Sequence, residues 1–355
     1  MSEVRIQKSE ISSLRHSASL RLCGVILLFT LTASAQWIKQ TVNTTASFRG
    51  LWVVNERVVW ASGTDGTVIR TIDDGKSWKV MTVPGAEKLD FRDIEAFDAN
   101  TAYILSIGNG ESSRIYKTVN GGKAWRLQFT NTNDKAFFDA LACSDRNWCY
   151  AVSDPVKAPV KPKFHMISTS DGGSHWDADY WDGLYAIPDE AAFAASGTCF
   201  IVKGERLLLV SGGARASVYQ AWLTESSGSF ERHDTPFVSG SSGSGIFSIA
   251  MFDEKNGVIV GGNYEKPNEA TNNLAFTTDG GDTWKLRTGL SGYRSAVTYI
   301  DEKTIIAVGT NGTDITRDGG KTWKKIGNEN LNSVAARGKR AVWAVGPKGM
   351  VVKMK

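Results

Sequence analysis

The sequence predicts an all-β protein built as a single seven-bladed β-propeller of four-stranded antiparallel blades. Three observations lead to this fold class. A turn motif close to T-x-D-x-G-x-[ST]-W recurs along the chain, seven apolar segments ending in small residues recur beside it, and the last unit lacks a strand that the N-terminal region can supply. The repeat length of roughly 40 to 55 residues is typical of propeller blades. The turn motif begins at Thr71, Thr118, Thr169, Thr277 and Thr316, with a degraded copy at Thr224.

The first 35 residues have the layout of a secretory signal peptide. An apolar run from Leu22 to Leu31 leads into an A-x-A site with cleavage expected after Ala35. The run is shorter than the 20 or so residues needed to cross a bilayer, so an uncleaved anchor is the weaker interpretation. We expect a mature chain of residues 36–355 without a transmembrane segment, secreted or periplasmic. The cations before the apolar run are Arg5, Lys8, Arg15 and Arg21.

Composition and charge are those of an ordinary globular domain. The chain of 355 residues is 41% hydrophobic and 22% charged, with a formal net charge of +4. The signal contributes +2, from four cations less Glu3 and Glu10, so the mature chain carries +2. Such a small excess of positive charge does not indicate a nucleic-acid-binding surface.

Each repeat reads as four short strands, named a to d from the centre outward. The second strand of every unit is the apolar segment that ends in small residues, and seven are found, centred on Trp60–Gly63, Ile104–Gly108, Tyr150–Ser153, Leu209–Gly212, Ile259–Gly262, Ala307–Gly309 and Ala344–Gly346. The seventh unit, 332–355, ends after its third strand. Residues 36–40 resemble the segments that follow the turn motifs, so we expect them to add the missing outer strand. Closing the ring in this way leaves no long unpaired edge.

The repeated aspartates and tryptophans are interpreted as scaffold. An aspartate in the third position of the motif can accept N–H groups of its own turn, and the glycine two residues later can adopt positive φ. The tryptophan then packs between strands or blades. Because this chemistry recurs in every unit, a structural role is favoured over metal binding, and no metal or cofactor is expected. The residues concerned are Asp73, Trp78, Asn120, Trp125, Asp171, Trp176, Asp279, Trp284, Asp318 and Trp323.

The cysteines allow one disulfide. Cys143 and Cys149 flank a short polar stretch that reads as a hairpin turn, and an oxidising compartment would permit a bridge between them. Two buried free thiols are the alternative interpretation. Cys23 would leave with the signal, and the redox state of Cys199 stays open.

Unusual charges gather at the starts of the innermost strands. In a four-stranded blade the start of strand a and the b–c loop share one face, and the a–b and c–d turns share the other. Arg49, Arg92 and Arg294 occupy equivalent positions in this alignment, which predicts a clamp for anions or carboxylates at the channel mouth. The alternative is a ring of structural ion pairs with the neighbouring acids. Those acids are Asp93, Asp139 and Glu190, the last in a fourth blade whose alignment is ambiguous.

The two longest b–c loops open on this same predicted face. They run over 154–163, which holds three prolines, and 264–273. Loops on a rigid scaffold often carry binding residues, so Asp154, Asn263 and Tyr264 complete the candidate face. The glycine- and serine-rich stretch 239–245 is expected to be a mobile connection between blades.

The turn motifs resemble the Asp-box, or BNR, repeat of sialidases and other secreted propellers. A second resemblance is carried by the segments Phe91–Asp93, Phe138–Ala140, Glu190–Ser196, Gly245–Ser248, Val260–Tyr264 and Gly292–Val297. Over nearly all of 36–355, the sequence resembles bacterial proteins related to the photosystem II stability and assembly factor. This resemblance implies a seven-bladed propeller that binds other proteins, and it implies no catalytic residue.

Two functions follow as hypotheses. The first is a non-catalytic, extracytoplasmic binding or assembly propeller, monomeric, with a protein partner on the arginine-rich face. The second is a glycoside hydrolase of sialidase type, for which Tyr293 and Glu190 are the nominal candidates. Sialidase folds have six blades, which weighs against the enzyme. Two carboxylates such as Asp139 and Glu190 at glycosidase spacing over an open cleft would favour it.

Overall fold

The computed structural model describes residues 37–156, 161–178, 181–223 and 228–355. The chain divides into two units, Met1–Ser34 and Ala35–Lys355. The predicted signal peptide and its cleavage site lie outside the described residues. So do the start of the degraded turn motif at Thr224 and the middle of the predicted loop 154–163.

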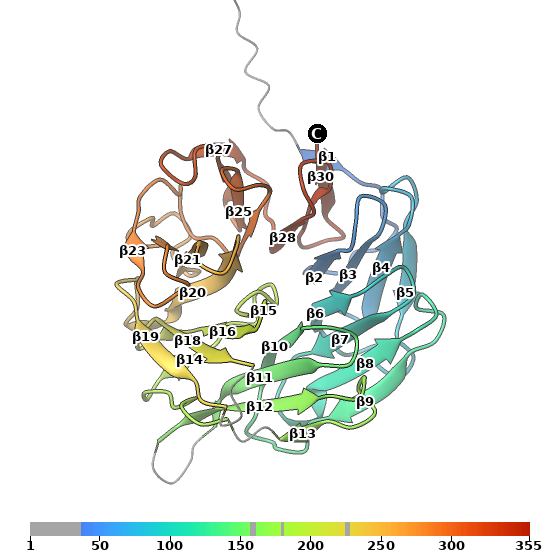
Figure 1. The fold of residues 1–355 in the computed structure, drawn as a ribbon. Helices are drawn as coiled ribbons and strands as arrows, with labels where there is room; N and C mark the ends of the chain where they lie inside the picture. Colours follow the sequence, from blue (N-terminus) through green and yellow to red (C-terminus); the bar gives the residue numbers. More distant parts are fainter. Residues whose placement is uncertain (1–36, 157–160, 179–180, 224–227) are drawn as a thin grey trace, which may run out of the picture. The chain divides into compact units, whose positions relative to one another are not determined.

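Seven antiparallel sheets are arranged around a central axis, which confirms the predicted propeller (Figure 1). A single short 3₁₀ helix, η1 (Gly110–Ser112), is found in the described part of the chain. Blade 1 consists of β2 (Phe48–Val53), β3 (Val59–Gly63), β4 (Thr67–Thr71) and β5 (Lys79–Thr82). Blade 2 consists of β6 (Phe91–Ala96), β7 (Ala102–Ser106), β8 (Arg114–Thr118) and β9 (Arg126–Thr130). Blade 3 consists of β10 (Phe138–Cys143), β11 (Cys149–Val156), β12 (Lys163–Thr169) and β13 (Asp177–Ala178).

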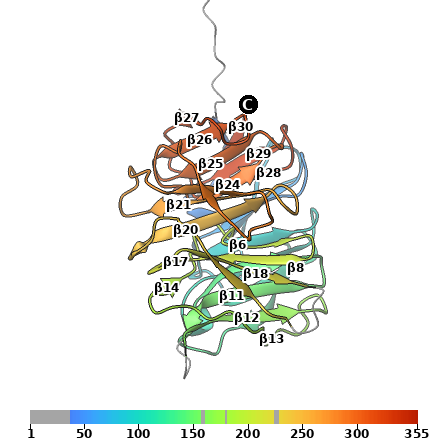
Figure 2. The same ribbon diagram turned by 60° about the vertical axis from the view of Figure 1, so that its left-hand side comes forward.

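The remaining blades follow the same order, and the turned view in Figure 2 shows β20, β21 and β24 to β30 of this half. Blade 4 consists of β15 (Phe200–Lys203), β16 (Arg206–Val210), β18 (Ser217–Trp222) and β19 (Glu231–Asp234). Blade 5 consists of β20 (Ser241–Met251), β21 (Gly257–Asn263), β22 (Leu274–Thr277) and β23 (Lys285–Leu286). Blade 6 consists of β24 (Ala296–Tyr299), β25 (Ile305–Gly309), β26 (Gly312–Thr316) and β27 (Lys324–Gly327). Blade 7 consists of β28 (Ser333–Ala336), β29 (Val342–Val345), β30 (Val351–Met354) and β1 (Trp37–Lys39).

The ring closes through the N-terminal strand, as predicted. Strand β1 pairs antiparallel with β30, with Trp37 opposite Met354. The indole Nε1 of Trp37 also donates a hydrogen bond to Thr313 Oγ1 in blade 6, at 3.0 Å. At the next interface, Lys353 forms an ion pair with Asp74 of blade 1 at 2.6 Å. The two ends of the propeller are therefore joined by backbone pairing and by side chains on both flanks.

The Asp turns share one hydrogen-bond pattern. In the first, Asp73 Oδ1 accepts from the Thr71 hydroxyl at 2.8 Å and from Ser77 N at 2.9 Å, while Thr71 Oγ1 accepts from Gly75 N. The hydrogen bond from the Ser77 hydroxyl is the largest influence that lowers the Asp73 pKa, to about 2. Equivalent threonine contacts link Thr118 to Asn120, Thr169 to Asp171, Thr277 to Asp279 and Thr316 to Asp318.

Tryptophans of the Asp turns pack against the blade before their own. Trp78 meets Trp343 of blade 7 edge to face at 5.6 Å, and Trp125 meets Trp60 of blade 1 at 6.4 Å. Trp176 makes the same contact with Tyr103 of blade 2 at 6.3 Å. These turns therefore join neighbouring blades through aromatic contacts.

The fourth blade departs from the predicted pattern. Its innermost strand is β15, which starts ten residues after Glu190. Glu190 instead begins the short strand β14 (Glu190–Ala191), which pairs with β17 (Gly212–Gly213), and β17 pairs with β20. Blade 5 is thereby extended to a six-stranded sheet. The prediction of a mobile connection over 239–245 is wrong from Ser241 onward, because this stretch pairs with strands on both sides.

The two hairpin cysteines are bonded to each other. Cys143 and Cys149 face each other in the β10–β11 ladder and form a disulfide, while Cys199 is a buried free thiol. In the described residues, no helix has the length and apolar character to span a membrane.

Candidate functional site

The channel mouth at the starts of the innermost strands holds a cavity of about 320 Å³, here named the arginine pocket. It lies on the face where sequence analysis placed the binding residues. Blades 1, 2, 5, 6 and 7 contribute to its wall, together with the segment before β15. Its lining residues are Arg49, Arg92, Phe193, Ala194, Ala195, Phe247, Tyr264, Tyr293, Ser295, Thr310 and Asn332.

Two arginines reach across the mouth to the segment before blade 4. Arg49 Nη1 donates to the carbonyl oxygen of Ala195 at 3.0 Å, and Arg92 Nη1 donates to that of Ala194 at 3.2 Å. Arg92 Nε also pairs with Asp90 at 2.8 Å. Burial and, next, the charge of Arg92 lower the pKa of Arg49. A guanidinium has five N–H donors, so both arginines keep donors that these contacts do not use.

Aromatic rings form the other wall of the arginine pocket. Phe193 stacks on Phe247 with 3.9 Å between ring centroids, and Tyr293 meets Phe247 edge to face at 4.8 Å. Tyr264, directly after β21, contacts Phe247 at 6.2 Å and is 47% exposed. Asn263, the last residue of β21, holds the start of this loop by accepting a hydrogen bond from Glu265 N at 2.9 Å. The pocket thus combines positive charge with a partly exposed aromatic surface.

Arg294 does not belong to the expected clamp. Its side chain is fully buried in blade 6, where Nη2 forms an ion pair with Asp314 at 2.5 Å. Nη1 donates to Asn311 Oδ1 at 2.6 Å. The side chain turns from the channel into its own blade because buried acceptors are available there. The interpretation as a structural ion pair therefore applies to Arg294, with a partner that sequence analysis did not name.

The predicted acids are buried and bind backbone or hydroxyl groups. Asp93 accepts from Ile94 N at 2.8 Å and from Leu141 N of blade 3 at 2.7 Å. Glu190 accepts from the hydroxyls of Ser211 and Tyr219 at 2.5 and 3.0 Å. These contacts hold neighbouring strands and blades together, so neither carboxyl group offers its oxygens to the arginine pocket.

Burial is the main cause of a raised pKa in three carboxyl groups of the predicted face, Asp93, Asp139 and Asp154. It raises the pKa of Asp93 to about 7 and that of Asp154 to about 6. Asp154 also accepts a hydrogen bond from Ala192 N at 2.9 Å. Burial, followed by the neighbouring charge of Asp154, raises the pKa of Asp139 well above its usual range. Asp139 is therefore a poor candidate for a permanent negative charge on the face.

The geometry does not favour a sialidase-type site. Asp139 and Glu190 are 1% and 4% exposed, so neither stands over an open cleft. Tyr293 does line the arginine pocket, but burial raises the pKa of its hydroxyl, which disfavours the phenolate. In the described residues, no cluster of three or more His, Cys, Asp or Glu side chains is arranged to hold a metal ion.

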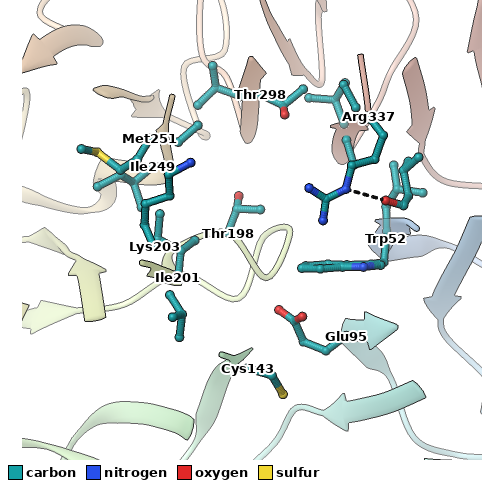
Figure 3. A pocket seen from close by; sticks show the side chains of 18 residues that line it. Trp52, Glu95, Cys143, Thr198, Ile201, Lys203, Ile249, Met251, Thr298 and Arg337 are labelled. Atoms are coloured by element: carbon teal, nitrogen blue, oxygen red, sulfur yellow. Dashed lines mark hydrogen bonds between the residues drawn. The ribbon is translucent and has the colours of Figure 1, made fainter. Parts of the chain in front are cut away.

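A second cavity, of about 280 Å³, lies where the innermost strands end. We name it the tryptophan pocket, after Trp52 of β2. Figure 3 shows Trp52, Glu95 and Arg337 on one wall and Lys203, Ile249 and Met251 across from them. Sequence analysis missed it because only the starts of the innermost strands were aligned. The sequence signal that could have indicated this pocket is Glu95, a carboxylate between the apolar residues at the end of β6.

The segment 193–198 separates the two pockets. Ala194 and Ala195 line the arginine pocket, and Thr198 lines the tryptophan pocket. Ser196 Oγ donates to the carbonyl oxygen of Ser295 at 3.0 Å, and the Thr198 and Ser248 hydroxyls are 2.7 Å apart. This channel segment is therefore tied to blades 5 and 6 and lies between the two cavities.

Comparisons with solved structures identify propellers of similar fold. No protein-family model and no curated protein matches the sequence. The structure of YCF48 bound to D1 peptide is similar with a TM-score of 0.61 and 15% identity, over 90% of this chain and 94% of that one. YCF48 from Cyanidioschyzon merolae gives 0.57 and 16%, over 90% and 99%. The WD40 β-propeller domain of Doa1 gives 0.57 and 12%, over 91% and 97%. At these identities the likeness shows the fold.

Proposed function

We propose that this protein is a non-catalytic binding or assembly propeller that holds a peptide segment of a protein partner in the arginine pocket. The carrying observation is that Arg49 and Arg92 stand, with unused donors, beside the exposed ring of Tyr264 in one cavity. Guanidinium groups bind carboxylate and carbonyl oxygens through several parallel hydrogen bonds. Tyrosine and arginine are also the residue types that most often dominate binding energy at interfaces.

The similar structures support a peptide as the ligand. One of them is YCF48 bound to D1 peptide, a propeller of this fold in complex with a peptide. By analogy, we extend peptide binding to this chain and regard it as a propeller of the photosystem II assembly-factor type with Asp-box turns. The analogy does not extend to the identity of the peptide.

We further propose that the protein acts outside the cytoplasm as a monomer. The support is the signal-like sequence before residue 36 and a disulfide, which persists in oxidising compartments. The small net charge of the mature chain supports a protein ligand over a nucleic acid.

The proposal is tested by capture from the native cell envelope with tagged mature protein. Wild type is compared with Tyr264→Ala and with the double variant Arg49→Ala/Arg92→Ala, after circular dichroism shows that each is folded. Arg340→Ala is the matched control, because Arg340 is an exposed arginine that lines neither pocket. We expect one partner to be retained by wild type and the control and lost by both pocket variants. Equal recovery by all four proteins would contradict the proposal.

A further inference from the structure

The tryptophan pocket contains a carboxyl group that makes no hydrogen bond to a described residue. Glu95 lies in β6 and is 7% exposed, and its side chain reaches into the cavity (Figure 3). Among the described residues, no hydrogen bond to its carboxyl oxygens is found. Buried carboxyl groups are normally satisfied by hydrogen bonds or a counter-charge. The carboxyl group of Glu95 faces the cavity, so a donor that enters the cavity can bind its oxygens.

A cation faces Glu95 without touching it. Arg337, directly after β28, donates from Nε to the carbonyl oxygen of Val53 at 3.1 Å, and its guanidinium lies 5.9 Å from the Trp52 ring centroid. Its charge acts on Glu95, yet the two groups form no ion pair at contact distance. The free face of the guanidinium points into the cavity in Figure 3. A ligand that fits between the two groups would meet an acceptor on one side and donors on the other.

The remaining wall is largely apolar. Ile201, Ile249 and Met251 stand opposite Trp52. Lys203 closes this side, with Nζ donating to the carbonyl oxygen of Phe252 at 2.9 Å. A cavity of about 280 Å³ with an indole ring and aliphatic side chains suits one apolar group of modest size.

We propose that the tryptophan pocket binds a free α-amino acid with an apolar side chain, whose ammonium group pairs with Glu95 and whose carboxylate pairs with Arg337. The apolar side chain lies against Trp52 and the isoleucines. This site is on the opposite end of the channel from the arginine pocket and does not depend on the function proposed there.

Proton balance gives the proposal a distinct signature. Burial, and next the charge of Asp93, raise the pKa of Glu95 well above its usual range, so the empty pocket favours the neutral carboxyl group. An ammonium group brings its own three protons and pairs with the carboxylate. The Glu95 proton then passes to the buffer, and the protein–ligand complex gains an ion pair.

Isothermal titration calorimetry tests the site in the mature protein. The probes are leucine, methionine and phenylalanine, with leucinamide as a cation-only probe and 4-methylpentanoate as an anion-only probe. We expect at least one of the amino acids to bind about tenfold or more tightly than either single-charge probe, because each of these probes lacks one of the two charged contacts. Titrations in buffers of different ionisation enthalpy should show proton release on binding.

Variants separate this site from other carboxylates. Glu95→Gln should weaken amino-acid binding about tenfold or more and abolish proton release, and Arg337→Met should weaken binding to a similar extent. Glu254 is an exposed carboxylate that does not line the tryptophan pocket, so Glu254→Gln should leave amino-acid binding and proton release unchanged. The proposal is overturned if none of the three amino acids binds in the millimolar range or if 4-methylpentanoate binds as tightly as leucine. The wild-type probe series decides these two outcomes even if Glu95→Gln fails to fold.

Discussion

The guanidinium of Arg294 and the carboxylate of Asp314 form a fully buried ion pair, with 2.5 Å between Nη2 and Oδ2. Asp314 also accepts from Ser291 N at 2.8 Å. The network joins β26 to the segment before β24 and satisfies a charge that the interior could not otherwise hold. Arg294 thus contributes to the stability of blade 6, although its sequence position is equivalent to those of Arg49 and Arg92.

Replacement of Arg294 should therefore reduce stability. Arg294→Met leaves Asp314 as an uncompensated buried charge, and we expect a loss of about 3–5 kcal/mol in the free energy of unfolding. The double variant Arg294→Met/Asp314→Leu should lose less than Arg294→Met alone, because it removes both charges. Urea denaturation followed by tryptophan fluorescence measures the difference. The exposed Arg287→Met is the control, expected within about 0.5 kcal/mol of wild type, and a single variant as stable as this control would refute the structural role.

Asp93 should make stability depend on pH. Its folded-state pKa is about 7, whereas an unfolded aspartate titrates near 3.9. The folded state therefore binds a proton more tightly, and the contribution of Asp93 to stability falls as the pH rises from about 4 to about 7. Below that window it is fully present. The whole change is about 4 kcal/mol at most, from 1.36 kcal/mol per pKa unit.

The measurement compares wild type with Asp93→Asn by urea denaturation from pH 4 to pH 8. Asparagine cannot accept both of the hydrogen bonds from Ile94 N and Leu141 N, so the variant is less stable than wild type at low pH. The pH dependence is the diagnostic quantity, because the difference between wild type and variant should shrink as the pH rises. A difference that stayed constant across this range would mean that Asp93 does not titrate there.

Much of the architecture could be predicted from the sequence, because the same turn motif and strand pattern recur along the chain. The Thr71–Asp73 pair of one turn recurs in three others and as Thr118–Asn120 in a fourth. The number of second strands gives seven blades without any long-range information. Closure by β1 followed from the strand missing after β30. Such features depend on local spacing, which a single sequence contains.

The pockets depend on the directions in which side chains point, and the spacing of residues along the sequence does not determine these directions. Arg49 and Arg294 hold equivalent places before or within an innermost strand, yet one points into the channel and the other into its blade. The difference arises because Asp314 on β26 forms an ion pair with Arg294, whereas the carbonyl oxygen of Ala195 in the channel segment accepts a hydrogen bond from Arg49. This segment is an irregular insertion before β15, so no repeat alignment predicts it. The tryptophan pocket lies at the other ends of the innermost strands, which were not aligned, and Thr198 of the same irregular segment closes one side of it.

The disulfide should make a moderate contribution to stability. Cys143 and Cys149 close a loop with a sequence separation of six residues. The chain-entropy relation gives about 2 kcal/mol for so short a loop. The double variant Cys143→Ser/Cys149→Ser should lose about that amount in urea denaturation, and wild type in excess dithiothreitol should lose as much. A dithiothreitol effect that persisted in the double variant would point to a different cause.

Gly197 lies in the channel segment, directly beside the carboxyl group of Asp93. Its φ is +77°, and a Cβ atom placed there would overlap Asp93 Oδ1, which is itself fixed by its hydrogen bond from Ile94 N. Gly197→Ala therefore incurs both the cost of a left-handed backbone conformation, about 1–2 kcal/mol, and a steric clash with a buried carboxyl group.

Gly85→Ala isolates the first of these costs, since Gly85 has a φ of +76° and no atom near its Cβ position. We expect Gly197→Ala to lower the free energy of unfolding by at least about 1 kcal/mol more than Gly85→Ala does. The double variant Gly197→Ala/Asp93→Ser should recover part of the excess, because the shorter side chain makes room for the new methyl group. This coupling is specific to a channel segment packed against Asp93. Equal losses for the two alanine variants would contradict the close packing of the channel segment against Asp93.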